Sequence, residues 1–141
     1  MTARGATVIY TSGTAIMACD AKEKFSADLL ISLHCDFSGS SSSNGLKMIY
    51  HQGNSRSEAF AKEVDSQISR QYNSHCRTVS DAETDRGSLG LIDEGNRRAV
   101  PAVMCEMGFM SNATDIANID SSGMQAKAAD AFADACAAYL N

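Results

Sequence analysis

The chain has 141 residues, of which 44% are hydrophobic and 21% are charged. This is ordinary globular usage for one domain, and it excludes a disordered or fibrous chain. The formal net charge of -5 argues against a nucleic-acid binder, and no apolar run reaches the roughly 20 residues that cross a bilayer, so neither partner is expected.

The cysteines are widely spaced and include no C-x-x-C pair. This pattern predicts reduced, mostly buried thiols, not a disulfide scaffold or a cysteine zinc site. The first residues lack a basic region followed by an apolar stretch, so no signal peptide is predicted. The five cysteines are Cys19, Cys35, Cys76, Cys105 and Cys136.

The first third of the chain predicts strand, helix and strand. Residues 7–10 (TVIY) have a β-branched and aromatic pattern typical of a strand. Thr14 is predicted to cap a helix that runs to about Phe25. Residues 28–34 predict a strand covered on both faces, because 29–33 are nearly all apolar, and the Ser-rich residues 38–45 predict a flexible loop.

The middle of the chain predicts a half-buried strand over 46–50 and then a helix. Ser55 and Glu58 match a capping box, and an apolar stripe follows at i+4 spacing. Residues 73–90 are predicted to form a polar loop, and residues 89–92 a short strand. The stripe consists of Phe60, Val64, Ile68 and Tyr72.

The last third predicts a buried strand over 101–106, with Pro101 at its first residue. Ser111-Asn112 is predicted to cap a short helix through Ile119, and Ser122 with Gln125 to cap a final helix. Strands alternating with helices indicate a single-domain α/β fold, with a mostly parallel mixed sheet and helices on both faces.

Two polar residues end the apolar strands of this predicted sheet, His34 and Glu106. If the strands are parallel neighbours, both side chains lie at the same edge, where α/β proteins gather functional groups. A histidine and a carboxylate there suit metal binding and proton transfer, although a structural role for each is the alternative. Burial after an apolar run would raise the pKa of the Glu106 carboxyl.

Other candidates give weaker signals. His51 is interpreted as a solvated loop residue, and His75 with Cys76 as too small a set for a metal site. Cys35 is not expected to act as a nucleophile with His34, because adjacent strand residues point to opposite faces.

Two segments resemble a known family. Residues 27–36 (ADLLISLHCD) resemble the A-D-L-x-I-S-x-H-x-N strand of zinc-dependent N-acetylmuramoyl-L-alanine amidases, and residues 101–112 (PAVMCEMGFMSN) resemble their P-A-V-L-x-E-x-G-F-x-S-N segment. Shorter matches in the same order occur at residues 3–11, 44–50 and 86–87. These enzymes form the catalytic domains of bacterial autolysins, sporulation lysins and many phage endolysins.

The resemblance implies a function and roles for two residues. The substrate is peptidoglycan, cleaved at the amide between the lactyl group of N-acetylmuramic acid and L-alanine, with the cell wall as the site of action. His34 corresponds to one ligand of a single zinc ion, and Glu106 to the catalytic general base. Residues 1–141 are thus expected to form an amidase-like catalytic domain.

The same resemblance implies that the domain is incomplete at its N-terminal side. The family's first strand, its Gly-His-Gly-Gly loop and a following helix that starts with a glutamate have no counterpart, so two of three zinc ligands are missing. Nothing in the spacing of His75 or Asp36 supports a replacement, and Asp36 stands where the family has asparagine.

Several alternatives stay open. Self-association or a partner chain would cover the edge left by the missing strand. The chain would otherwise be a non-catalytic relative that binds peptidoglycan or a protein, or an unrelated α/β domain in which His34 and Glu106 are structural.

Overall fold

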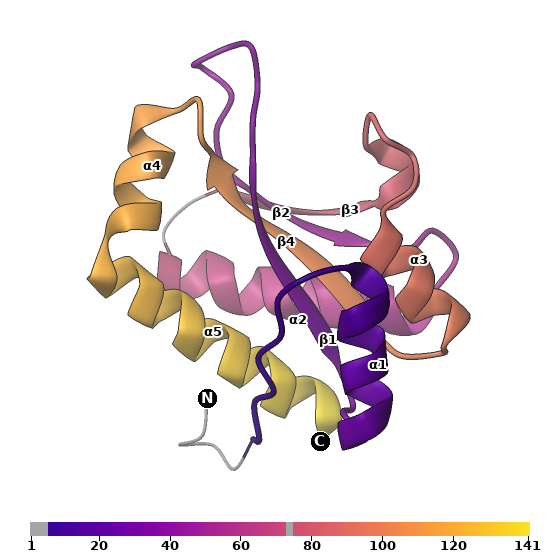
Figure 1. Ribbon diagram of the computed structural model, residues 1–141. Helices are drawn as coiled ribbons and strands as arrows, with labels where there is room; N and C mark the ends of the chain where they lie inside the picture. Colours follow the sequence, from indigo (N-terminus) through magenta and orange to yellow (C-terminus); the bar gives the residue numbers. More distant parts are fainter. Residues whose placement is uncertain (1–5, 73–74) are drawn as a thin grey trace.

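The computed structural model describes residues 6–72 and 75–141 and shows one α/β domain (Figure 1). Among these residues, no helix is both long and apolar enough to span a bilayer. The elements are α1 (Ala15–Phe25), β1 (Leu30–Asp36), β2 (Leu46–Tyr50), α2 (Ser55–Tyr72), β3 (Cys76–Ser80), the 3-10 helix η2 (Asp81–Glu83), α3 (Gly90–Arg97), β4 (Ala102–Phe109), α4 (Ala113–Asp120) and α5 (Ser122–Leu140).

The four strands of the described chain form one mixed sheet in the order β1-β4-β2-β3. β1 runs parallel to β4 and β2 parallel to β3, while β2 and β4 are antiparallel. The predicted fold class, an α/β domain with a mostly parallel mixed sheet, is confirmed.

Helices cover both faces of this sheet, as predicted. On one face, α2 and α5 enclose the larger core, in which Phe60, Val64 and Ile68 are fully buried beside Phe132. On the other face, α3 places Ile92 against the sheet, and α1 packs on α3 (Figure 1). The predicted apolar stripe of α2 is therefore confirmed.

The predicted strand over residues 7–10 does not form. The segment is irregular, and the side chain of Tyr10 is 89% exposed. A strand needs a hydrogen-bonded neighbour, and within the described residues neither this segment nor the outer edge of β1 has one. The helices also leave part of β1 uncovered: Leu33 is 61% exposed, so the prediction that this strand is covered on both faces is wrong. Association of another chain with this edge stays a prediction.

The region between α2 and β4 also differs from the prediction. Cys76–Ser80 forms β3, although a sequence with a single aliphatic residue, Val79, looks like a loop. Residues 90–92 begin α3 and not a strand, because a short apolar run fits either element until its neighbours decide.

Two helix caps lie one residue earlier than predicted. The side chain of Asn54 accepts the backbone N–H of Ser57 at 3.0 Å at the start of α2, and Ser121 caps α5. Thr14 and Asn112 cap α1 and α4 as predicted. All five thiols are free; Cys19 and Cys105 are buried, whereas Cys35 is exposed.

Candidate active site

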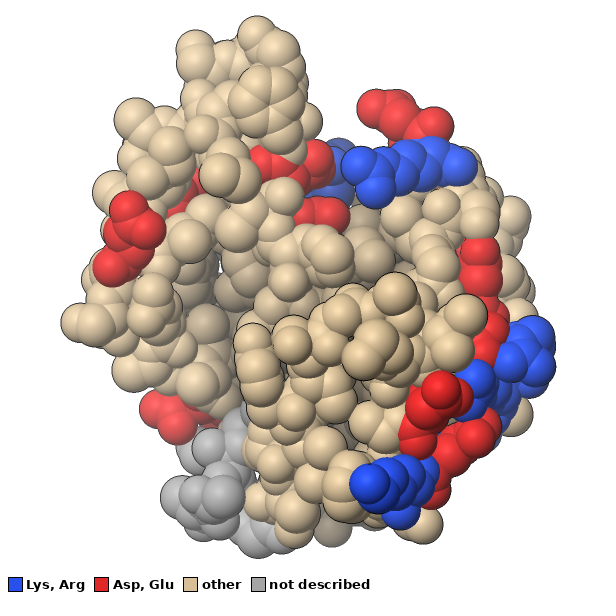
Figure 2. Space-filling model, viewed as in Figure 1, with Lys and Arg blue, Asp and Glu red and all other residues tan. Residues whose placement is uncertain are grey.

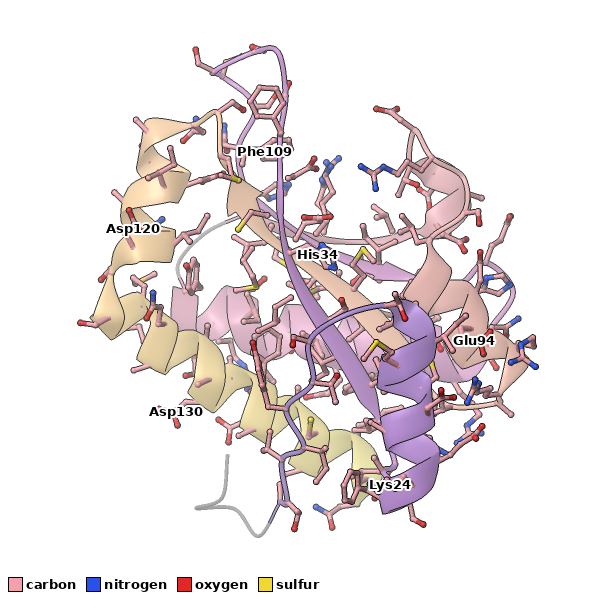
Figure 3. All side chains as sticks on the ribbon, in the orientation of Figure 1. Lys24, His34, Glu94, Phe109, Asp120 and Asp130 are labelled. Carbon is pink, nitrogen blue, oxygen red and sulfur yellow. The ribbon has the colours of Figure 1, made fainter. Side chains whose placement is uncertain are left out.

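The parallel pairing of β1 with β4 brings the two predicted site residues together. His34 and Glu106 are direct partners in the register of the two strands, which confirms that they share one edge of the sheet. The His34 side chain is exposed, and its Nε2 lies 2.9 Å from Ser32 Oγ. Figure 3 shows it beside the strands of the sheet, and it lines the cleft described below.

Glu106 is only partly accessible and poorly satisfied. Its Oε2 atom is buried and has no hydrogen-bond partner among the described residues. Burial, and secondly the nearby Asp36 carboxylate, raise the pKa of the Glu106 carboxyl, while His34, Lys47 and Arg86 act in the opposite direction. A half-buried carboxylate with a free oxygen and a raised pKa has the properties of a general base.

Lys47 places a positive charge next to this carboxylate. It pairs with Glu106 across the antiparallel β2–β4 ladder, and its Nζ lies 2.5 Å from Asp36 Oδ2. The ammonium also lies 4.9 Å from the centre of the Phe109 ring. Lys47 therefore neutralises the charge of Asp36, the residue that stands where the resemblance implies an asparagine.

These residues line the floor of a cleft of about 610 Å³, within the range of ligand-binding pockets. β1, β2, β3 and β4 form the floor, and the segment between β3 and α3 forms a wall that carries Glu83, Asp85 and Arg86. Figure 2 shows acidic and basic side chains gathered around a hollow in the upper part of this face.

The Ser-rich loop beside the cleft is fixed to the start of α4. Ser38 N donates to Ser111 Oγ at 3.2 Å, and Asn112 Nδ2 donates to the Ser41 carbonyl at 2.8 Å. The loop is a surface connection, as predicted, but these hydrogen bonds hold it in place over the end of β4.

The described residues do not fit the complete zinc site that the resemblance implies. His34 belongs to no group of three metal-ligand atoms among them, and neither Asp36 nor the exposed His75 joins it in one. One ligand is too few, because catalytic zinc is held by three protein side chains.

One such group occurs elsewhere in the described chain, at His51, Asp81 and Asp93. His51 does lie in a loop, as interpreted, but it is not simply solvated: its ring is half-buried and contacts both carboxylates. Sequence reasoning also missed Lys47 and Arg86: the pairing of β2 with β4 brings Lys47 to Glu106, and the fold of the segment between β3 and α3 brings Arg86 there. The one signal in the sequence for the group at His51, Asp81 and Asp93 was the position of His51 directly after a predicted strand.

Comparison with known proteins identifies the family of this chain. The family model described as N-acetylmuramoyl-L-alanine amidase matches residues 2–138. No curated protein sequence matches significantly.

Among solved structures, the catalytic domain of CwlV, an N-acetylmuramoyl-L-alanine amidase from Bacillus (Paenibacillus) polymyxa var. colistinus, is 26% identical with a TM-score of 0.75; the alignment covers 92% of this chain and 67% of that one. The N-acetylmuramoyl-L-alanine amidase from Clostridium difficile 630 gives a TM-score of 0.77 at 20% identity, with 92% and 67% coverage. The CwlD amidase of Clostridioides difficile, solved with the GerS lipoprotein, gives 0.67 at 19% identity, with 95% and 71% coverage.

The last two likenesses, at low identity, support the fold alone. The family match extends over almost the whole chain and includes the strands that carry His34 and Glu106. This chain belongs to the N-acetylmuramoyl-L-alanine amidase family.

Proposed function

We propose that the cleft above β1 and β4 binds peptidoglycan and hydrolyses the amide between N-acetylmuramic acid and L-alanine, with Glu106 as the general base. The observation that carries the proposal is the buried, unpartnered Oε2 of Glu106 on the floor of the cleft, beside His34. A buried polar atom without a partner lowers the stability of the fold, so its presence calls for an explanation. A catalytic role for the carboxylate provides one.

In this proposal Glu106 moves one proton twice. Its carboxylate takes a proton from the attacking water and gives it to the amine of the leaving L-alanine. Burial raises the pKa of the Glu106 carboxyl toward neutral pH, which suits both proton transfers. His34 would contribute one zinc ligand, and because the described residues supply no second or third, we assign no step to a metal.

A non-catalytic, peptidoglycan-binding role is the second candidate, and the shortage of metal ligands around His34 favours it. The two functions differ in one measurement. Incubation with purified cell walls should release new L-alanine amino termini if the chain hydrolyses the amide. Co-sedimentation with the walls without new amino termini would support binding alone. If the chain neither binds the walls nor releases amino termini, both functions are excluded.

Replacing His34 by alanine is expected to lower amide hydrolysis about 10–100-fold, because its ring lies beside Glu106 on the floor of the cleft and losing a group that positions the substrate costs about this much. Stability should change by no more than about 0.5 kcal/mol, because the ring is exposed and contacts only Ser32 Oγ. His75→Ala is the matched control, since this histidine is also exposed. Loss of stability without loss of hydrolysis would indicate a structural His34.

The pH dependence of hydrolysis tests the environment of Glu106. Since burial raises its pKa above the usual 4.5, activity should fall on acidification through this higher value. Lys47→Gln removes a charge that lowers this pKa, so the acidic limb of the kcat/KM profile should move to higher pH. Lys62→Gln removes an exposed lysine on α2 and should not move it. Identical profiles for all three proteins would contradict the assignment of Glu106.

A further inference from the structure

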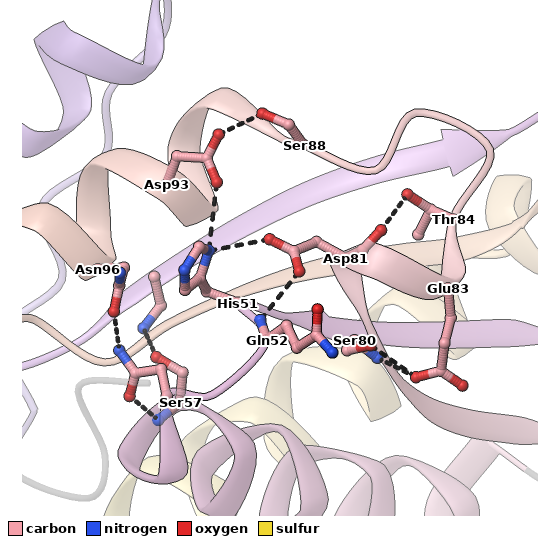
Figure 4. A network of polar contacts seen from close by, with 12 residues as sticks. His51, Gln52, Ser57, Ser80, Asp81, Glu83, Thr84, Ser88, Asp93 and Asn96 are labelled. Carbon is pink, nitrogen blue, oxygen red and sulfur yellow. Dashed lines mark hydrogen bonds and ion pairs between the residues drawn. The ribbon is translucent and has the colours of Figure 1, made fainter.

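We propose that His51, Asp81 and Asp93 form a binding site for one divalent transition-metal cation, separate from the candidate active site. The three residues come from different parts of the chain. His51 directly follows β2, Asp81 begins η2, and Asp93 lies in the first turn of α3 (Figure 4). The proposal does not depend on the amidase function.

The spacing of the ligand atoms fits a metal. His51 Nδ1 lies 3.0 Å from Asp81 Oδ2 and 3.2 Å from Asp93 Oδ1, and all three atoms are within 4.8 Å of one another. Ligands about 2.0–2.2 Å from one cation are separated from each other by roughly 3.0–3.5 Å. A nitrogen and two carboxylate oxygens are a donor set that suits Zn²⁺.

Each carboxylate is oriented by a contact outside the group. The backbone N–H of Gln52 donates to Asp81 Oδ1 at 2.9 Å, and the hydroxyl of Ser88 donates to Asp93 Oδ2 (Figure 4). The second oxygen of each carboxylate is thereby left to face His51. Outer contacts of this type commonly fix the ligands of metal sites.

The charge balance is an independent argument. The Asp81 side chain is only 3% exposed, and no lysine or arginine in the described part of the chain forms an ion pair with Asp81 or Asp93. A single ring N–H serves two carboxylates incompletely, and buried charge is costly without compensation. A divalent cation would neutralise both, and the partial exposure of His51 and Asp93 gives it a path from solvent.

The proposed site lies at the other end of β2 from Glu106. Lys47 pairs with Glu106, and His51 follows four positions later, roughly 13 Å along the strand. A cation here would tie the β3–β4 connection to the sheet on both sides of the wall that carries Arg86. Its expected effect is therefore to order one wall of the cleft.

Calorimetric titration of the metal-free protein with Zn²⁺ tests this. We expect one bound ion per chain and a higher melting temperature with zinc. His51→Gln and Asp93→Asn should each weaken binding at least 10-fold and remove the thermal shift. His34→Ala should retain both, which separates this site from the candidate active site.

The Asp93→Asn variant protects the test against misfolding, because this side chain is 41% exposed and the amide keeps its size. The metal-free variants should have wild-type circular dichroism. Zinc binding that survives both variants, zinc binding that disappears in His34→Ala, or the absence of stoichiometric binding would overturn the proposal.

Discussion

A Glu106→Gln variant is expected to lose about 10²–10⁴-fold in peptidoglycan amide hydrolysis, the contribution usual for a positioned general base. Glutamine has nearly the same shape and can fill the same half-buried position on the floor of the cleft. It cannot accept a proton from water, so the chemical step should fail while the fold persists. The measurement is the rate at which L-alanine amino termini appear from purified cell walls.

The stability of the same variant gives a second readout. A carboxyl whose pKa is raised in the folded state binds protons more tightly there than in the unfolded chain. Its contribution to stability is therefore present below the usual pKa of 4.5 and is lost as pH rises through the folded value. The glutamine variant lacks this loss, so at neutral pH it should be at least as stable as wild type.

Urea unfolding at pH 4 and pH 7 measures this difference. Glu63→Gln is a matched control, because Glu63 bonds Gln67 on α2 outside the cleft. It should leave both hydrolysis and the pH dependence of stability unchanged. Wild-type hydrolysis by Glu106→Gln would disprove the proposed role of Glu106.

The second large effect is expected at Asp115, where alanine should cost roughly 2–6 kcal/mol of unfolding free energy. Asp115 is 5% exposed, and its Oδ2 accepts the backbone N–H groups of Gly45 and Phe109, each at 2.9 Å. Alanine leaves both buried donors unsatisfied, at about 1–3 kcal/mol each. These hydrogen bonds join the start of β2 to the end of β4, the strands that carry Lys47 and Glu106, so their loss should also loosen the candidate active site.

Gly108 shows how closely this support is packed. Its φ is +134°, and a Cβ there would lie 2.9 Å from the Asp115 Cβ. Asp115→Asn should cost less than alanine, since the amide keeps an acceptor oxygen. Asp120→Ala, on the exposed side of the same helix, should change stability by no more than about 0.5 kcal/mol. Equal midpoints for the alanine variants at 115 and 120 in chemical denaturation would contradict this account.

The central part of the site was predictable from the sequence. His34 and Glu106 each end an apolar run, and parallel strands place such residues at one edge. The stripe of α2 was equally readable, because its apolar residues recur at helical spacing and all face the core.

The remainder depends on tertiary structure. The partial burial of Lys47 beside Glu106 requires β2 to run antiparallel to β4, and no periodicity encodes that direction. β3 owes its existence to pairing with β2, since its own sequence is largely polar. His51, Asp81 and Asp93 converge only after β3 and α3 are placed. Residues 7–10 likewise have the propensity of a strand, but within the described residues they have no hydrogen-bonded neighbour to pair with.

The position of β4 in the middle of the sheet has a consequence for folding. This strand is the last of the four in the described chain, and it forms both the ladder to β1 and the ladder to β2. Such pairings join residues far apart in sequence, which slows folding. A polypeptide emerging from the ribosome can form the local β2–α2–β3 unit early, but β1 has no strand to join until β4 has been synthesised. The candidate active site is therefore expected to assemble in the last stage of folding, after most of the chain has left the ribosome.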